Sequence, residues 1–199
     1  MLPASAATAP AAVPGDPGRT LATFVFADIV GFSALTEERG DEHAAAMALA
    51  FHAAVRSLLG EHRATEVKTI GDAIMLRVPD AAEAIRLGAR IVRRLCDVGL
   101  PPVRVGMDTG WAVGLGADWF GSTVNRAARL CSASGPNELL VSGPTRDAAR
   151  GVDRLGLGIA EDFSLRNIAE PVPAHRGVPL VAAPAALGVT ARRRHLHAV

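Results

Sequence analysis

The order in which the hydrophobic periodicity changes along this 199-residue chain is the feature that most constrains its fold. Apolar residues alternate where a strand is expected and recur at helical spacing where a helix is expected. The predicted elements are, in order, a strand at 21–27, a helix opening at Asp41, strands at 64–69 and 73–78, a helix opening at Asp80 and a strand at 103–107. This is the order of the ferredoxin-like βαββαβ core, an antiparallel sheet with two helices on one face. We therefore predict an α+β fold in which the other sheet face is left open for a partner.

Each of the two predicted helices has one apolar face. In the first helix this face comprises Ala44, Met47, Ala48, Phe51, Val55, Leu58 and Leu59. In the second helix it comprises Ala84, Ile85, Gly88, Ile91, Val92 and Leu95. Asp80 and Glu83 form a capping-box-like start to the second helix, and Pro101 and Pro102 end it.

Further elements are predicted after this core. A third helix at 121–132 has an apolar face, and Asn125 and Arg129 share a different edge of it. The apolar face comprises Val124, Ala127, Ala128 and Cys131. Strands at 138–142 and 162–168 and a short helix near 144–150 complete the expected C-terminal part.

The composition favours one ordered domain between two tails. We expect a disordered, Ala- and Pro-rich lead at 1–18, an ordered domain at 19–180 and a flexible tail with arginine and histidine at 181–199. The net charge of +1 argues against a nucleic-acid partner, and no apolar run approaches the length of a membrane span. Cys96 and Cys131 fall in helical patterns, so we expect buried, unpaired thiols in a reducing, cytoplasmic protein.

Two aspartates end apolar, strand-like runs at turn-like sequences. Asp28 precedes Gly31, whose tight turn can aim backbone amides at an anion, and Asp72 follows Gly71 at the tip of the predicted hairpin. Either aspartate alone could be a turn or cap residue. If both tips converge, they offer the hard oxygen ligands that Mg²⁺ takes together with substrate phosphates, which points to phosphoryl transfer. No P-loop and no kinase catalytic loop occurs.

Four segments, FADIVGFS, EVKTIGDAIM, RVGMDTG and DWFGSTVNRAARL, occur in this order and together resemble the catalytic domain of class III adenylate and guanylate cyclases, in its short bacterial form. The resemblance runs over about 20–178 and implies the nucleotide cyclase fold. It implies that Asp28 and Asp72 hold two Mg²⁺ or Mn²⁺ ions, with the backbone carbonyl of Ile29 as a further ligand. The backbone amides implied to hold the phosphates are those of Val30, Gly31 and Phe32.

The same resemblance implies the substrate and the reaction. Lys68 and Asp118 stand where the family reads the purine, and these residue types pair with adenine, whereas guanylate cyclases typically carry Glu and Cys there. Asn125 would orient the ribose and Arg129 would stabilise charge on the transferred phosphate. The implied reaction converts ATP to 3′,5′-cyclic AMP and pyrophosphate. The family shares each site across a dimer, so a homodimer with two sites is expected.

Three departures from the family pattern keep alternatives open. Asp108 stands where the family commonly has His and receives no role, the segment at 111–117 is shorter than the family's usual arm, and Arg166 replaces a phosphate-contacting Lys. An active adenylate cyclase is the favoured interpretation. The alternative is a cyclase-like dimer that binds nucleotide or a partner but turns over little, and guanylate cyclase activity is disfavoured by Lys68.

Overall fold

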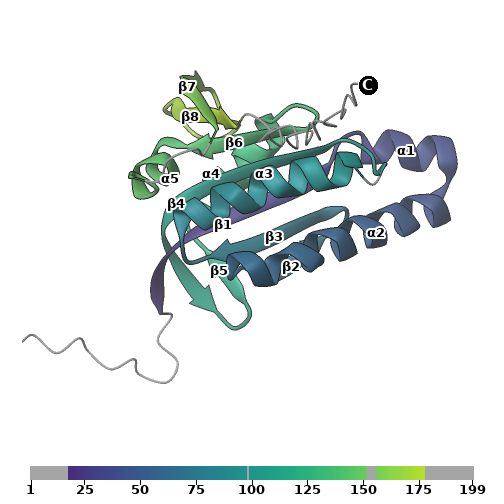
Figure 1. Ribbon diagram of the computed structural model, residues 1–199, viewed down its shortest axis with the longest axis horizontal. Helices are drawn as coiled ribbons and strands as arrows, with labels where there is room; N and C mark the ends of the chain where they lie inside the picture. Colours follow the sequence, from purple (N-terminus) through teal and green to yellow (C-terminus); the bar gives the residue numbers. More distant parts are fainter. Residues whose placement is uncertain (1–17, 98, 152–155, 178–199) are drawn as a thin grey trace, which may run out of the picture.

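One mixed sheet forms the centre of the computed structural model, which describes residues 18–97, 99–151 and 156–177. The strands are β1 Arg19–Ile29, β2 Thr65–Ile70, β3 Ala73–Val78, β4 Val103–Leu115, β5 Asp118–Phe120, β6 Glu138–Ser142, β7 Leu157–Phe163 and β8 Val172–Gly177. The helices are α1 Phe32–Arg39, α2 Asp41–Leu59, α3 Ala81–Asp97, α4 Ser122–Ala133 and α5 Gly143–Ala148, with a 3₁₀ turn at Gly60–His62. The sheet runs in the order β2-β3-β1-β4-β6-β8-β7, and β5 pairs with β4 (Figure 1).

The predicted ferredoxin-like core is confirmed. Its four strands lie in the order β2-β3-β1-β4, and all three pairings between them are antiparallel. The expected hairpin joins β2 to β3, with Gly71 at φ 60° in its turn. Because β1 is flanked by β3 and β4, its residues 23–27 are paired on both sides. Asp28 therefore extends from a strand that is held on both sides.

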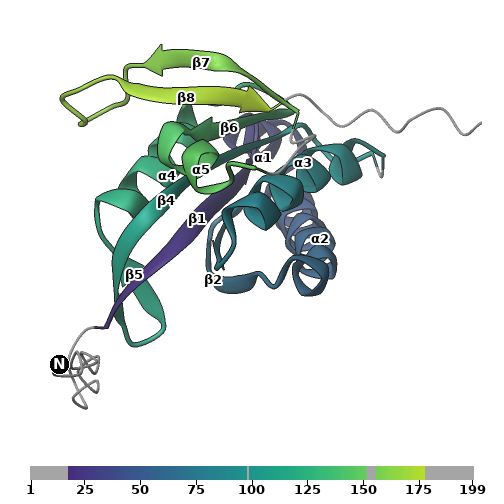
Figure 2. The same cartoon turned by 60° about the vertical axis from the view of Figure 1, so that its left-hand side comes forward.

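Helices α2 and α3 cover one face of this core, as predicted (Figure 2). The apolar face expected for α3 is buried throughout, and that of α2 is buried except for the half-exposed Met47 and Leu59. The Asp80 carboxylate accepts a hydrogen bond of 2.9 Å from the Glu83 amide, which confirms the predicted start of α3. The helix ends at Asp97, before the two prolines.

Helix α4 covers much of the face that the sequence left open. Val124, Ala127 and Cys131 of α4 are buried against Phe24 of β1 and Met75 of β3. The views in Figures 1 and 2 place α4 on the side of β1 and β4 opposite to α3. The expectation of an open face is therefore wrong for this region, because α4 folds back onto its own sheet.

Several strand predictions were incomplete. The strand predicted at 103–107 continues to Leu115 and turns back as β5, and β6 adds to it in parallel, so the complete sheet is not purely antiparallel. The strand expected at 162–168 lies earlier, at Leu157–Phe163, and β8 was not predicted. Strand β7 has no buried residue, so it lacks the alternation that periodicity detects. The short helix α1 was also missed.

The two cysteines differ from each other. Cys131 is buried as expected, and burial raises the pKa of its thiol to about 12. Cys96 is exposed, which corrects the prediction, because it lies on the solvent side of α3. Both thiols are free.

The lead predicted at 1–18, apart from Gly18, and the tail at 181–199 lie outside the described residues. No helix within the described ranges is long and apolar enough to cross a membrane.

Candidate active site

Asp28 and Arg104 lie opposite each other in the ladder between β1 and β4. Cross-strand partners point to the same sheet face, which here is the face that carries α4. The Arg104 guanidinium donates to one Asp28 carboxylate oxygen from Nε at 2.9 Å and from Nη2 at 2.5 Å. Its Nη1 also donates to the carbonyl of Ser132 at 3.2 Å. Arg104, which the sequence analysis missed, thus joins the first aspartate to the end of α4.

Asp72 reaches the same place from the β2–β3 turn. Burial, a hydrogen bond with the neighbouring Asp28 and charge repulsion from Asp28 together raise the pKa of its carboxyl to about 6. The two aspartates therefore converge, which meets the condition set in the sequence analysis for a shared metal site, although they are far apart along the chain.

This pair of carboxylates fits a divalent cation. Arg104 offsets part of the charge of the two carboxylates, and after burial it is their proximity that raises the pKa of Asp72. Carboxylate and carbonyl oxygens are the ligands that Mg²⁺ takes, usually with substrate phosphates completing the shell. No three His, Cys, Asp or Glu side chains of the described ranges gather into a complete metal cage. The site therefore fits a cation that arrives with a phosphate-bearing substrate.

The backbone after Asp28 turns sharply into α1. Gly31 has φ 75° and caps α1, which begins at Phe32. The Val30 amide donates to the Pro102 carbonyl at 2.8 Å, so it is already used and does not face an anion. Of the three amides expected to hold phosphates, those of Gly31 and Phe32 remain, at the start of a helix where backbone N–H groups favour negative charge.

Lys68 and Asp118 form a second pair. The Lys68 ammonium donates to the Asp118 carboxylate at 2.5 Å, across 50 positions of sequence. The other Asp118 oxygen accepts the Trp119 amide at 2.8 Å, and these two contacts lower the pKa of the Asp118 carboxyl. The two residues expected to read a purine thus meet at one point.

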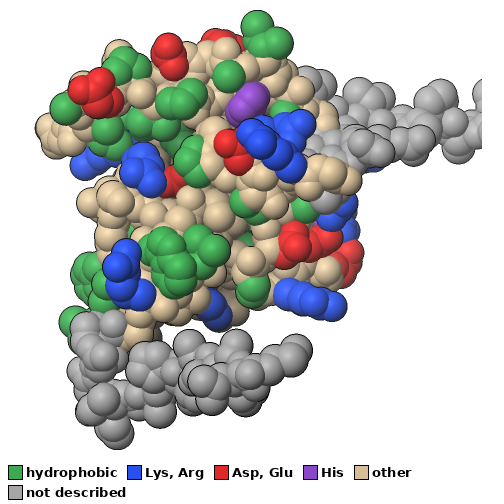
Figure 3. All heavy atoms as spheres, turned by 90° about the vertical axis from the view of Figure 1, so that its left-hand side faces the viewer, with side chains coloured by type: hydrophobic (Ala, Val, Ile, Leu, Met, Phe, Trp, Pro, Cys, Tyr) green, Lys and Arg blue, Asp and Glu red, His purple; other side chains and the backbone are tan. Residues whose placement is uncertain are grey.

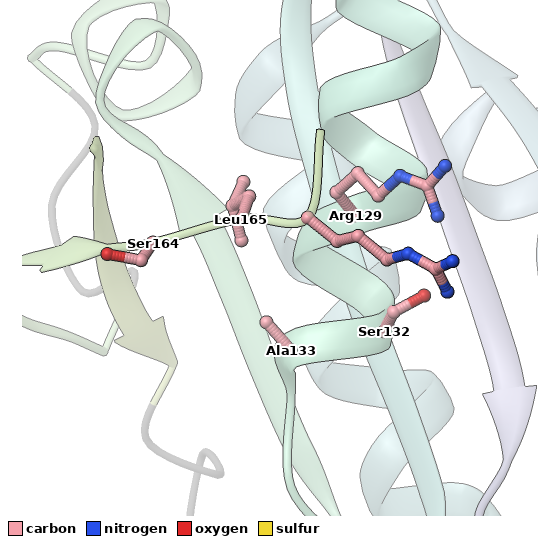
Figure 4. A pocket seen from close by; sticks show the side chains of 6 residues that line it. Arg129, Ser132, Ala133, Ser164 and Leu165 are labelled. Atoms are coloured by element: carbon pink, nitrogen blue, oxygen red, sulfur yellow. The ribbon is translucent and has the colours of Figure 1, made fainter. Parts of the chain in front are cut away.

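Helix α4 presents Asn125 and Arg129 outside its buried face, as predicted. Arg129 and Ser132 line a pocket of about 280 Å³ together with Ser164 and Arg166 (Figure 4). Leu165, which is buried against Leu130 of α4, anchors the neighbouring loop. Arg166 lies in a turn between β7 and β8, where the sequence suggested a strand, and it shares the pocket with Arg129.

No hydrogen bond or ion pair within the described parts of the chain joins these three groups to one another directly. The carboxylate pair, the Lys68–Asp118 pair and the α4 residues Asn125 and Arg129 each remain separate. Asp28 and Lys68 nevertheless share the sheet face of α4, since their cross-strand partners do. The arrangement offers a cation site, a polar pair for a base, and guanidinium groups for phosphates.

Comparison with known proteins identifies the family of this domain. The family model of the adenylate and guanylate cyclase catalytic domain matches residues 19–161. The chain belongs to this family. It is 36% identical over 133 residues to a pH-sensitive adenylate cyclase of Mycobacterium tuberculosis, covering 66% of this chain and 33% of that protein. It is 34% identical over 119 residues to an adenylate cyclase of Streptomyces griseus, covering 59% and 30% of the two chains. The chain thus spans about a third of the length of these curated relatives.

Solved cyclase structures confirm the nucleotide cyclase fold. The adenylyl cyclase CyaB of P. aeruginosa superposes with a TM-score of 0.70 at 23% identity, covering 81% of this chain and 95% of that one. The adenylate/guanylate cyclase/hydrolase of Silicibacter pomeroyi gives 0.71 at 25% identity, covering 81% and 98%. The cyclase family generally uses divalent metal ions, in agreement with the carboxylate pair at Asp28 and Asp72.

Proposed function

We propose that this protein is an adenylate cyclase, which converts ATP to 3′,5′-cyclic AMP and pyrophosphate. The observation that carries the proposal is the contact between Lys68 and Asp118. Within the cyclase family the remaining question is which purine is read, and these are the two side chains to which the family resemblance gives that role.

The donor and acceptor pattern of this pair suits adenine. The Lys68 ammonium can only donate hydrogen bonds, and the ionised Asp118 carboxylate can only accept them. Adenine offers an acceptor nitrogen next to an amino donor, so each partner finds its complement. Guanine offers a carbonyl acceptor next to an N–H donor, which reverses the order along the base edge. The order in which Lys68 and Asp118 face the base thus decides between the purines, and since the family resemblance gives these residue types as the adenine pair, we propose ATP rather than GTP.

The proposed phosphate site combines the carboxylates with basic groups. Asp28, Asp72 and the carbonyl of Ile29 would hold two Mg²⁺ or Mn²⁺ ions. When bound, such ions supply neutralisation of phosphate charge and a lower pKa for a nearby hydroxyl. Arg129 and Arg166 share one pocket, so both guanidiniums can reach the same phosphates, as can the amides of Gly31 and Phe32.

The proposed chemistry is a displacement within one substrate molecule. The ribose 3′-hydroxyl loses its proton, its oxygen bonds to the α-phosphorus, and the bond from that phosphorus to the oxygen bridging to the β-phosphate breaks, releasing pyrophosphate. Asn125 would hold the ribose in line for attack, and Arg129 would stabilise negative charge on the transferred phosphate. Both residues lie one turn apart on α4, so a single helix would place both.

We also propose that the working form is a homodimer with two shared sites. Three groups that do not contact one another within one chain could be completed by the facing groups of a second copy. Large hydrophobic side chains are exposed at the end of the sheet where β5 turns back, namely Leu21, Trp111, Leu115 and Phe120. Figure 3 faces this side of the molecule and shows hydrophobic side chains gathered beside basic ones. Such a surface suits an interface.

The test is complementation between two variants. Asp72→Ala removes a metal ligand and Lys68→Ala removes a purine contact, so each homodimer should lose cyclic AMP formation from ATP and Mn²⁺. In an equal mixture, half of randomly paired dimers are mixed and each has one intact site, so about a quarter of wild-type activity should return. Exposed Arg150→Ala, in the turn after α5, is the matched control and should keep full activity.

Each outcome separates the alternatives. Activity that returns in the mixture supports both the reaction and the shared site. Variants that stay inactive when mixed, beside an active wild type, would argue for a site within one chain. A folded wild-type dimer that binds ATP without forming cyclic AMP would replace the enzyme with a nucleotide-binding module.

A further inference from the structure

Asp108 is a fully buried carboxylate in the middle of β4. One of its oxygens accepts the Ser142 hydroxyl of β6 at 2.6 Å, and the other accepts Arg126 Nε of α4 at 2.7 Å. Arg126 is 30% exposed, so its guanidinium enters the protein while its edge still meets solvent. The residue that sequence analysis left without a role thus forms an ion pair with the helix that carries Asn125 and Arg129.

Two glycines flank Asp108 on the same side of β4. A Cβ atom at Gly106 would lie 2.0 Å from the Cys131 nitrogen, and one at Gly110 would lie 2.6 Å from Thr123 Oγ1. Since alternate residues of a strand share a face, Gly106, Asp108 and Gly110 form one line under α4. The helix therefore rests on this strand at three successive points, with the ion pair at the centre.

The β6 side of Asp108 is also fixed. Ser142 Oγ lies 2.9 Å from Thr145 Oγ1 and accepts the Thr145 amide at 3.2 Å, which caps α5. Thr109 donates to Thr145 at 3.0 Å and contacts Thr23 Oγ1 at 2.7 Å. All of these side chains except Thr109 are fully buried. Asp108 therefore meets Arg126 from a position held by Ser142 of β6, which Thr145 of α5 fixes in turn.

We propose that Asp108 and Arg126 are positioning residues, whose buried ion pair fixes the rotation and height of α4 on the sheet so that Asn125 and Arg129 face the substrate. This inference rests on the proposed cyclase function. Arg126 lies between these two residues in sequence, and successive helix positions differ by about 100° around the axis. A rotation of α4 about its own axis would displace both functional side chains together.

The charges of Asp108 and Arg126 explain why removing one of the two should move α4. Burial raises the pKa of the Asp108 carboxyl, and the Ser142 hydrogen bond and Arg126 oppose this by favouring the charged form. Removing one partner leaves the other as a buried charge without its counterion. The guanidinium would then move toward water, and α4 would move with it.

The experiment uses the full chain with Asp108→Asn, Arg126→Met, the double variant and Arg126→Lys. We expect kcat for cyclic AMP formation to fall about 10- to 100-fold in each of the first three, because small misplacements of catalytic groups have effects of this size. KM for ATP should change less than about threefold, since Lys68 and Asp118 are untouched. The double variant should be no worse than either single one, and Arg126→Lys should recover part of kcat.

The matched control is Thr23→Val. It removes a fully buried hydroxyl of the same network on the sheet face opposite to α4, so it should lower stability and leave kcat unchanged. Amide hydrogen exchange gives a readout that needs no activity. Exchange in Ser122–Ala133 should quicken in Asp108→Asn, but not in Thr23→Val, relative to the amides of Ala81–Asp97.

The two proposals can fail separately. Wild-type protein without cyclase activity would overturn the proposed function, while the exchange data would still decide whether the ion pair anchors α4. An active wild type with wild-type kcat and unchanged α4 exchange in Asp108→Asn would overturn the positioning role. The same holds if Thr23→Val lowers kcat as much as Asp108→Asn does, since general destabilisation would then explain both.

Discussion

Gly106→Ala is predicted to displace the helix that carries Asn125 and Arg129. The new Cβ atom would lie 2.0 Å from the Cys131 nitrogen, 2.5 Å from the Leu130 carbonyl carbon and 2.6 Å from the Cys131 Cα. All three are backbone atoms, so no side-chain rotation relieves the overlap. Ordinary contact begins at 3.4 Å, so the backbones of β4 and α4 must separate by about 1.4 Å.

The size of the effect follows from this displacement. Overpacking a well-packed interior costs about 1–3 kcal/mol and occasionally more, and the backbone overlap here places Gly106→Ala at the upper end, about 3 kcal/mol. A misplacement of about 1 Å at a catalytic group can lower the rate about 100-fold. We therefore expect a less stable protein whose residual folded fraction has a kcat lower by one to two orders of magnitude.

Gly88→Ala on α3 is the matched control. Its Cβ atom would meet Met107 Cε at 2.8 Å and Leu139 Cδ1 at 3.0 Å, both at the ends of flexible side chains. Alanine also favours a helix over glycine by about 1 kcal/mol, which offsets the adjustment. This variant should lie within about 1 kcal/mol of wild type and keep its kcat.

The assays are urea denaturation followed by circular dichroism, and cyclic AMP formation at a temperature where each variant is fully folded. A Gly106→Ala protein with wild-type stability and wild-type kcat would refute the close packing of α4 on β4. Equal losses of stability and kcat in Gly106→Ala and Gly88→Ala would contradict the claim that overlap with backbone atoms is more disruptive than overlap with the ends of side chains.

Three further predictions concern charge. The folded-state pKa of Asp72 is about 6, above its ordinary 3.8, so the contribution of this carboxyl to the stability of metal-free protein is lost as the pH rises through 6. Asp72→Asn should therefore be more stable than wild type at pH 8 in EDTA. The difference in stability should shrink at lower pH and with added Mn²⁺. Burial, and then the charge of Arg56, lowers the pKa of His52 below 6.5, so the contribution of His52 to stability should fall as the pH drops below 6.5, opposite in sign to the contribution of Asp72. His52→Leu should remove this contribution, whereas the exposed control His43→Gln should not. The measurement is the midpoint of urea denaturation for each protein across pH 5–8. The combination Lys68→Glu with Asp118→Cys should lower cyclic AMP formation from ATP and raise cyclic GMP formation from GTP, and a retained ATP preference would contradict the purine assignment.

The sequence predicted those parts of the fold that have a strong local pattern. Helices α2 and α3 are long and have apolar faces, and the start of α3 has its own capping signal in Asp80. Strands β7 and β5 are short or exposed, so nothing in their composition separates them from loops. Strand β4 was predicted only as far as its core-facing residues Val103, Val105 and Met107.

For the site, sequence reasoning predicted residue types but not their partners. Two turn signals at strand ends singled out Asp28 and Asp72, their convergence was stated only as a condition, and the structure brings the pair together. The contact of Asp28 with Arg104 spans 76 positions, and that of Asp108 with Arg126 depends on how α4 lies on the sheet. Such contacts depend on tertiary packing, which periodicity does not encode. The Val30 amide is a similar case, since only the fold shows that Pro102 uses it.

If Lys68 and Asp118 read the purine as proposed, their short contact makes nucleotide selection an exchange reaction. In the unliganded chain each side chain already satisfies the other, so an incoming base must break an existing ion pair before it gains anything. A base that replaces both hydrogen bonds recovers this cost, whereas one that replaces a single bond leaves a charged partner unsatisfied. The internal pair therefore acts as a competing ligand present at every site. An incomplete mimic of adenine would not recover the free energy of breaking the pair. Selectivity then depends on the ion pair of the unliganded protein as well as on the contacts of the bound base.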